Sequence, residues 1–451
     1  MKTVIEKYGA RILGDLLSLS VFLVAVFSGG KTERLAPFIV GLLCLICAGL
    51  LLLKSARYLT LPFLHLSLLL IFCYDSYSFF INYLWLLPIV IVSMAVYLVR
   101  RRPPFVRGAC FWPLVAISVA TLCGGIGMIS PADYFRPASL VFMAGLGPGL
   151  ILSYWIMKNE LQNEEAREAF LGDLLRWGLT AAAIALQYAL PLLNEAHALD
   201  PLKVPQWSNN IATMLMIALP AAFAAKKRHV YHYLLAWVML VATLLIGSRG
   251  GQLFVLIEFV ICCLWVCYVS MKGVSKRKKY AFFGVMAAVA FCLIGAVVYE
   301  AVERELFIAG EVRFALLTRG FEDFRQNPLF GSGLGYRGNV DLFQGKQGTI
   351  NWYHIFISQV VGGLGICGVL AWCYQLYTRF CLALRARYSY EFGFALCYLG
   401  LFLMSMVNPG EFCPVPYAFL AVCFFAALEN RAETAGKLSL SQLYRPWKRE
   451  V

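Results

Sequence analysis

Residues 36–53, APFIVGLLCLICAGLLLL, form a segment of membrane-spanning length without a single charged side chain. An α-helix of about 20 apolar residues crosses the hydrocarbon core of a bilayer. Similar segments recur along the 451-residue chain, which is 61% hydrophobic and 14% charged. Because soluble domains are about one quarter charged, the sequence predicts an all-α integral membrane protein.

The apolar segments predict a bundle of about 12–14 transmembrane helices. The first segment has no small-residue cleavage site and further spans follow it, which is typical of a transmembrane helix rather than of a signal peptide. Cys44 and Cys47 lie inside the second segment, where free cysteine packs as a small apolar side chain. The predicted spans are residues 10–28, 36–53, 58–73, 78–99, 106–125, 137–157, 174–193, 208–225, 232–247, 250–270, 281–299, 354–377, 388–407 and 414–428.

Lysines and arginines gather in every second loop between these spans. Such loops face the cytoplasm under the positive-inside rule, so we expect both termini to be cytoplasmic. The net charge of +14 then reflects topology, and because the basic clusters are short separate loops we expect no nucleic-acid partner. The predicted inner-loop residues include Arg100, Arg101, Arg102, Arg107, Lys226, Lys227, Arg228, Lys272, Lys276, Arg277, Lys278, Lys279, Arg379, Arg385 and Arg387.

The longest loop, residues 300–352, is predicted to lie on the extracytoplasmic side. Long loops usually carry function or are disordered. Residues 311–326 (EVRFALLTRGFEDFRQ) have the pattern of an amphipathic helix, which Pro328 ends. A glycine-rich turn at 331–335 follows, and we interpret the loop as a lid against the outer membrane surface. The apolar side of the predicted helix consists of Val312, Ala315 and Leu316.

Two arginines on the predicted outer side are candidates for binding a diphosphate. Arg249 lies in GSRGG (247–251) between two spans, where the glycines allow close approach of a ligand and the start of a helix favours anions. Arg313 opens the predicted amphipathic helix, and Arg319, Arg325 and Arg337 are alternatives to it in the same loop. Arginine binds phosphate through a bidentate fork. The structural alternatives are a snorkelling side chain for Arg249 and a surface charge for Arg313.

His354 begins the span that follows the loop, and we interpret it as a candidate general base. An imidazole titrates near neutral pH, which suits this role; a hydrogen-bonded interfacial histidine is the alternative. Ser358, Val361, Gly365 and Gly368 follow it along one helical stripe. The glycines of this stripe leave room for another helix to pack closely.

Glu258 follows Arg249 within the same predicted span and would lie about 13 Å deeper in the membrane. Ionisable residues at such depth are functional candidates, and a structural role as the partner of a buried arginine or tyrosine is an equal alternative. Residues 333–338 fit G-x-G-x-x-G but lack the βαβ context of a nucleotide site. The sequence has no Walker A motif, no H-E-x-x-H motif and no convincing metal-ligand spacing. It therefore predicts no nucleotide, no metal and no other cofactor.

Four stretches together resemble the O-antigen ligase and O-antigen polymerase family of bacterial polytopic membrane glycosyltransferases. They are residues 207–212 (WSNNIA), residues 248–251 (SRGG), Arg313 followed by residues 327–333 (NPLFGSG), and His354 followed by Gly365 and Gly368. The chain departs from the family pattern at Ile355, a position that is usually polar. The resemblance covers roughly residues 200–410.

The resemblance implies a GT-C-like helical bundle with its active site on the extracytoplasmic face of the bacterial cytoplasmic membrane. Residues 1–200 would supply N-terminal transmembrane helices. Residues 201–430, including loop 300–352, would form the ligase- or polymerase-like region, and residues 431–451 a cytoplasmic tail.

By the same resemblance, the protein would transfer a glycan from undecaprenyl diphosphate to an acceptor hydroxyl, with inversion and without metal. Arg249 and Arg313 would bind the diphosphate and His354 would accept the proton. Asn210, Arg319 and Glu258 are further substrate-binding candidates. The expected partners are the lipid-linked glycan donor, a glycan or lipid-glycan acceptor and the bilayer.

Two questions stay open at the level of sequence. The acceptor is either another lipid-linked repeat unit, as for a polymerase, or another envelope molecule, as for a ligase; we favour a polymerase because no feature points to lipid A. A transporter or flippase of lipid-linked saccharides is the alternative class. It would predict charges scattered through the membrane and broken helices in both halves, whereas the candidate charges here gather at one face.

Overall fold

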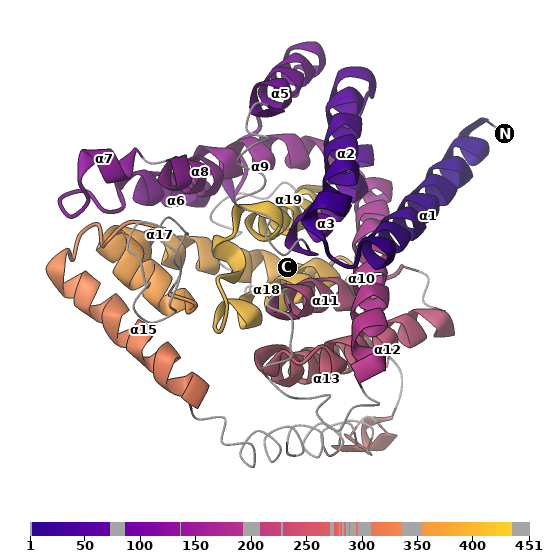
Figure 1. Cartoon of the computed structure of the whole chain (residues 1–451). Coiled ribbons are helices and arrows are strands. Elements are labelled where there is room, and N and C mark those ends of the chain that lie inside the picture. The colour runs from indigo at the N-terminus through magenta and orange to yellow at the C-terminus, as the bar shows by residue number, and fades with distance from the viewer. Residues whose placement is uncertain are drawn as a thin grey trace, which may run out of the picture. The chain divides into compact units, whose positions relative to one another are not determined.

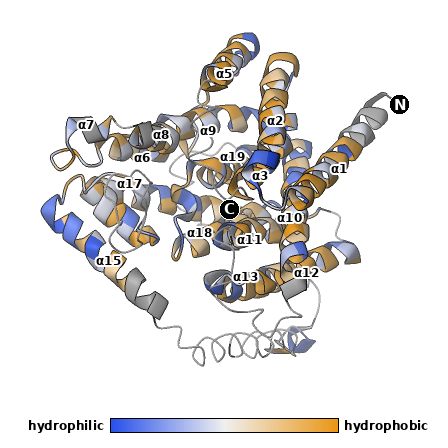
Figure 2. Cartoon of the chain, viewed as in Figure 1, coloured by the Kyte–Doolittle hydropathy of each residue, from blue (hydrophilic) through white to orange (hydrophobic). Residues whose placement is uncertain are grey.

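The computed structural model describes residues 2–72, 86–135, 137–192, 208–226, 229–270, 308–334 and 353–434, with isolated positions between 275 and 295. Helices dominate these residues and none of them forms a strand (Figure 1). Figure 2 shows that most of these helices are apolar, whereas α15 carries many polar residues. The predicted all-α fold class is confirmed.

The predicted spans overlap helices wherever the structure describes them. The segment predicted at 137–157 forms two helices separated at Gly147, and 281–299 lies almost entirely outside the described residues. The elements are α1 (Lys2–Ser28), α2 (Thr32–Leu52), η1 (Ala56–Leu59), α3 (Thr60–Phe72), α5 (Leu87–Arg101), α6 (Phe111–Cys123), α7 (Pro131–Tyr134), α8 (Pro137–Leu146), α9 (Pro148–Glu160), α10 (Glu164–Leu192), α11 (Ser208–Phe223), α12 (Val230–Leu245), α13 (Arg249–Ser270), α15 (Ile308–Gln326), α17 (Phe356–Ala386), α18 (Phe392–Ser405), η4 (Gly410–Phe412), η5 (Pro414–Ala418) and α19 (Phe419–Thr434).

Helix length and composition support a protein that crosses a membrane several times. Five described helices, namely α1, α2, α10, α13 and α17, contain segments long and apolar enough to span a bilayer. Five shorter apolar helical segments accompany them, at Ala56–Phe72, Phe111–Cys123, Ser208–Phe223, Val230–Leu245 and Phe392–Ser405. The chain is therefore an all-α integral membrane protein.

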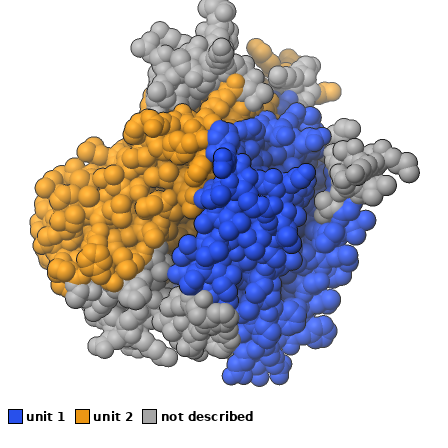
Figure 3. Space-filling view, turned by 90° about the horizontal axis from the view of Figure 1, so that it is seen from above, with its two compact units in different colours: residues 1–104, 159–271 blue, residues 105–158, 272–451 orange. Residues whose placement is uncertain are grey.

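The chain forms two compact units, each built from two separate segments. Unit 1 contains residues 1–104 and 159–271, and unit 2 contains residues 105–158 and 272–451 (Figure 3). This division by compactness is distinct from the division at residue 200, which follows the extent of the resemblance and stays a prediction.

In unit 1, α11 is the central helix and packs against α10, α12 and α13. Its residues from Ile211 to Phe223 are buried along their whole length. Small residues permit this packing, because a side chain at Gly178 of α10 would bring its Cβ within 2.3 Å of Ala218 Cβ. Helix α11 is therefore held closely by its neighbours from Ile211 onward.

In unit 2, α17 is broken at Gly365, whose backbone angles are φ 62° and ψ −156°. The turn that follows α15 docks into this break. Ile366 N–H donates to the carbonyl of Pro328, and Ser332 N–H donates to the carbonyl of Gly362, each at 2.8 Å. Interrupted backbone inside a membrane protein must find such partners within the protein. Segment 328–333 thus completes the hydrogen bonding of the broken helix.

Helix α15 also packs closely along the first part of α17. A Cβ built on Gly320 would lie 2.7 Å from Ser358 Cβ, and one on Gly362 would lie 2.7 Å from Gly320 Cα. The predicted amphipathic helix at 311–326 is confirmed. The predicted stripe of Ser358, Val361, Gly365 and Gly368 is not one continuous helical face, because α17 is broken at Gly365, and the close helix contact is made at Ser358 and Gly362 instead. The described part of loop 300–352 is consequently anchored to α17.

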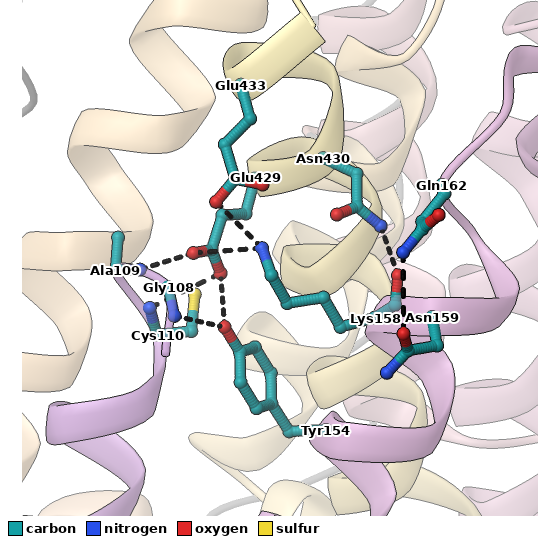
Figure 4. Close-up of polar contacts among 10 residues, drawn as sticks. All are labelled: Gly108, Ala109, Cys110, Tyr154, Lys158, Asn159, Gln162, Glu429, Asn430 and Glu433. Atoms are coloured by element: carbon teal, nitrogen blue, oxygen red, sulfur yellow. Dashed lines mark hydrogen bonds and ion pairs between the residues drawn. The ribbon is translucent and has the colours of Figure 1, made fainter. Parts of the chain in front are cut away.

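A buried ion pair joins α9 to α19 in unit 2 (Figure 4). Lys158 Nζ lies 3.2 Å from Glu429 Oε1 and 2.8 Å from Glu433 Oε1. Glu429 also accepts hydrogen bonds from Tyr154 OH at 2.9 Å and from the backbone N–H of Ala109, just before α6. These hydrogen bonds offset the cost of removing the charges from water, and the cluster ties three helices together.

The prediction that Arg379 belongs to an inner loop is wrong, because α17 continues to Ala386 and buries this residue. Its guanidinium pairs with Glu411 of η4 and donates to Tyr398 OH at 2.7 Å. Tyr398 OH in turn donates to Glu411 Oε2 at 2.9 Å. A charge neutralised in this way can lie inside an apolar helix. The sequence prediction treated Arg379 as a loop residue because a charged residue usually marks the end of a membrane span.

Candidate functional site

In unit 1, two of the predicted motif stretches meet at the amino-terminal ends of α11 and α13. Ser248 Oγ donates a hydrogen bond to Asn209 Oδ1 at 2.7 Å and accepts one from Gly251 N–H at 3.2 Å. Ser248 is thereby the N-cap of α13. A Cβ on Gly251 would lie 2.7 Å from Ala212 Cβ, so this glycine permits the close approach of the two helices.

The unit 1 candidates lie on these same two helices. Arg249 is the first residue of α13 and Asn210 lies in the first turn of α11; both side chains are half-buried. Glu258 lies deeper along α13 and is 0% exposed. The amino-terminal end of a helix carries partial positive charge. Two such ends beside an arginine form a surface suited to an anion.

In unit 2, a buried hydrogen-bond network lies immediately before His354. Tyr353 OH donates to Asp323 Oδ2 and lies 2.8 Å from Ser332 Oγ. Asp323 and Ser332 are 0% exposed, and Tyr353 is 5% exposed. The network therefore connects α15, the turn after it and the chain entering α17, and its side chains are buried.

His354 itself has a left-handed backbone, with φ 53°, and a half-buried side chain. Non-glycine residues rarely adopt this conformation, and those that do are enriched at functional sites. The next residue, Ile355, is the N-cap of α17 and supplies no side-chain hydrogen bond to the helix. The departure from the family pattern therefore falls on the N-cap position.

The remaining candidates lie on α15. Arg319 is half-buried in the middle of the helix. Arg313 lies in α15, but its side chain is outside the described residues. Because Arg249 belongs to unit 1 whereas Arg313 and His354 belong to unit 2, their convergence on one substrate stays a prediction. Trp207 of the first motif stretch and most of loop 300–352 also lie outside the described residues.

Asp323, Tyr353 and Ser332 did not emerge from the sequence as site residues. A signal was nevertheless present: steps of four and three from Leu316 lead to Gly320 and Asp323, which places a carboxylate on the apolar face of a predicted helix. A charged residue in that position needs a buried partner.

Among the described residues, no group of three or more His, Cys, Asp or Glu side chains could hold a metal ion. The candidate residues instead offer hydrogen-bond donors, positive charge and one imidazole. Such groups can bind an anionic group and accept a proton. The expectation of metal-independent chemistry stays a prediction.

The helices and these residues define an integral membrane protein with polar candidate residues at the starts of α11, α13 and α17. Residues 234–373 match the sequence model of the family described as O-antigen ligase, which supports the predicted assignment to the O-antigen ligase and polymerase family. The match contains Arg249, Glu258, Arg313, Arg319 and His354, and it begins after Asn210. A search of curated proteins and a search of solved structures each returned no match.

Proposed function

We propose that this O-antigen ligase- or polymerase-like protein is a membrane glycosyltransferase that moves a glycan from a polyprenyl diphosphate to an acceptor hydroxyl. The observation that carries the proposal is that the matched segment, residues 234–373, contains Arg249, Arg313 and His354. These are the residue types that the chemistry needs: two permanent positive charges for a diphosphate and one proton acceptor for a hydroxyl.

The diphosphate of the donor would bind at the amino-terminal end of α13. There Arg249 can form a bidentate pair with phosphate oxygens, and the end of the helix adds partial positive charge. Arg313 would supply a second guanidinium. As the bond between the sugar and the diphosphate breaks, negative charge grows on the leaving group, and groups already oriented toward it stabilise the transition state.

His354 would act on the acceptor. Its neutral imidazole accepts the proton of the acceptor hydroxyl while that oxygen attacks the anomeric carbon from the side opposite the diphosphate. A new carbon–oxygen bond forms as the anomeric carbon–phosphate oxygen bond breaks, and the released electron pair stays on the polyprenyl diphosphate. The configuration of the anomeric carbon is inverted, and no nucleotide or metal enters this scheme.

The acceptor is the least constrained part of the proposal. A second lipid-linked repeat unit would make the protein a polymerase, which we favour, and another envelope molecule would make it a ligase. Asn210, Arg319 and Glu258 are the candidates for contacts with either substrate. We place the reaction on the extracytoplasmic face of the bacterial cytoplasmic membrane, with both termini in the cytoplasm.

A transporter or flippase of lipid-linked saccharide is the second candidate. One observation bears on it, namely the break in α17 at Gly365. In transporters, broken helices expose their ends to the transported substrate. Here the carbonyls of Pro328 and Leu329 instead accept hydrogen bonds from the N–H groups of Ile366 and Cys367. That arrangement favours a fixed catalytic framework.

The test uses purified protein and a synthetic polyprenyl-diphosphate oligosaccharide, without ATP or added metal. We expect the wild type to release polyprenyl diphosphate and form a longer glycan, and His354→Asn to do neither. The identity of the product separates a polymerase from a ligase. Passage of the donor across liposomes without any transfer, over a range of glycans, would instead support the transporter.

A further inference from the structure

The buried network of Asp323, Tyr353 and Ser332 has a specific relation to His354, because Tyr353 is the residue directly before it. The Tyr353 hydroxyl donates to the Asp323 carboxylate and lies 2.8 Å from Ser332 Oγ. Burying the carboxyl group of Asp323 costs free energy unless its hydrogen bonds are made. The hydroxyl of Tyr353 therefore has a strongly preferred position.

The two partners of Tyr353 are themselves held in place. Asp323 belongs to α15, which packs on α17 through the close approach of Gly320 to Ser358 and Gly362. Ser332 N–H donates to the carbonyl of Gly362 at 2.8 Å, within the turn that caps the break in α17. Both partners are thus fixed to the same helix that begins just after His354.

The chain between these anchors is very short. Tyr353 is held at its hydroxyl and α17 begins at Phe356, so only His354 and Ile355 connect the two points. The chain makes this connection with His354 in the left-handed region, at φ 53°. A left-handed conformation at a non-glycine residue persists only where the surrounding structure determines it. The hydrogen bonds of Tyr353, the preceding residue, can fix the conformation of His354 in this way.

We infer that Asp323, Tyr353 and Ser332 are positioning residues that hold His354 in the orientation from which it accepts the proton of the acceptor. They touch neither substrate nor the reacting atoms in this scheme; they act through the backbone of His354. The inference rests on the function proposed above for His354, but the orientation of its imidazole can be measured without any transfer reaction.

The experiment compares Tyr353→Phe, Asp323→Asn and Ser332→Ala with a matched control, Tyr154→Phe. The control removes the same kind of hydroxyl, one that donates to a buried carboxylate in the same unit, namely Glu429. The first measurement is the rate at which diethyl pyrocarbonate modifies His354, followed by mass spectrometry of the purified protein. His229 and His232 in the same molecule are internal references.

We expect Tyr353→Phe to change the modification rate of His354 several-fold while the rates of His229 and His232 stay constant. In the transfer reaction we expect its kcat to fall at least about tenfold with KM within about twofold, as a displaced base affects the chemical step. Asp323→Asn keeps an acceptor oxygen and should have a smaller effect. Tyr154→Phe should leave both the His354 rate and kcat at the wild-type values.

An unchanged His354 modification rate in Tyr353→Phe and Asp323→Asn would overturn the inference, as would equal effects in Tyr154→Phe. If the wild type shows no transfer with any donor, the proposed function fails, and the modification rates alone then decide whether the network positions His354. If Tyr353→Phe does not fold, Ser332→Ala decides in its place. It removes one contact of Tyr353, together with the hydrogen bond from Ser332 Oγ to the carbonyl of Gly362 at 3.2 Å, and should shift the His354 rate in the same direction.

Discussion

Ser248 and Asn209 join the starts of two helices through one hydrogen bond of 2.7 Å, from Ser248 Oγ to Asn209 Oδ1. Ser248 caps α13 and Asn209 lies in the first turn of α11. Arg249 directly follows the cap. The bond therefore sets the relation between the candidate anion-binding residue and the neighbouring helix end.

A double-mutant cycle tests whether this bond matters. We expect Ser248→Ala to lower the free energy of unfolding by about 1 kcal/mol, because an N-cap is lost. Asn209→Ala should cost a similar amount, and the two changes together should cost less than their sum by about 1 kcal/mol. Thermal unfolding in detergent provides the measurement. Strict additivity would show that the two side chains do not interact.

Replacement of Arg249 by lysine separates a bidentate phosphate contact from a simple positive charge. We expect Arg249→Lys to lose at least about tenfold in kcat/KM, because an ammonium cannot reproduce the planar fork. Arg100→Lys, at an exposed position in the last turn of α5, is the matched control and should behave as the wild type. Full activity of Arg249→Lys would assign Arg249 the role of a membrane-interface anchor only.

Two substitutions of His354 separate the role of its imidazole as a proton acceptor from the effect of its left-handed backbone on stability. Both His354→Asn and His354→Ala should abolish transfer, because neither side chain accepts the proton at neutral pH. Asparagine tolerates the left-handed conformation at φ 53°, whereas alanine there costs about 1–2 kcal/mol. We therefore expect only His354→Ala to lower the unfolding temperature appreciably. Transfer by either folded variant would exclude His354 as the general base.

The helices were predictable because apolar segments of membrane length have few alternatives. The predicted spans cross the membrane in alternating directions, and two contacts in the structure join residues that this alternation puts on the same side. Lys158 and Glu429 directly follow the predicted spans 137–157 and 414–428, and they form an ion pair, so these two spans finish on the same side; that this side is the inner one stays a prediction. Asn209 and Ser248 were both predicted on the outer side, and they share a hydrogen bond.

The details of the site were less predictable, because they depend on contacts between distant segments. The segment NPLFGSG was recognised as a motif, but its role in capping the break at Gly365 depends on the docked geometry. Asp323 was overlooked because a helix pattern ranks charged residues as exposed. Arg379 was misplaced for the same reason, since its partner Glu411 is thirty-two positions away in sequence.

The proposed orientation can be tested with single cysteines on exposed positions. Thr318 lies on the exposed face of α15, and Gln162 lies between α9 and α10 at the predicted inner side. We expect Thr318→Cys to react with a membrane-impermeant maleimide on intact cells and Gln162→Cys to react only after permeabilisation. The wild type, with its own 15 cysteines, gives the background. The reverse pattern would invert the topology.

The Lys158–Glu429 pair should govern stability rather than chemistry. Their side chains are 3% and 2% exposed, so Lys158→Met or Glu429→Leu alone leaves a buried charge with one partner fewer. We expect each single change to cost about 3–5 kcal/mol, and the combined Lys158→Met, Glu429→Leu variant to cost less than either, because both charges are then gone. Thermal unfolding measures the cost. The kcat per folded molecule should stay at the wild-type value in all three variants; a selective loss of kcat in the combined variant would show that the cluster takes part in the reaction.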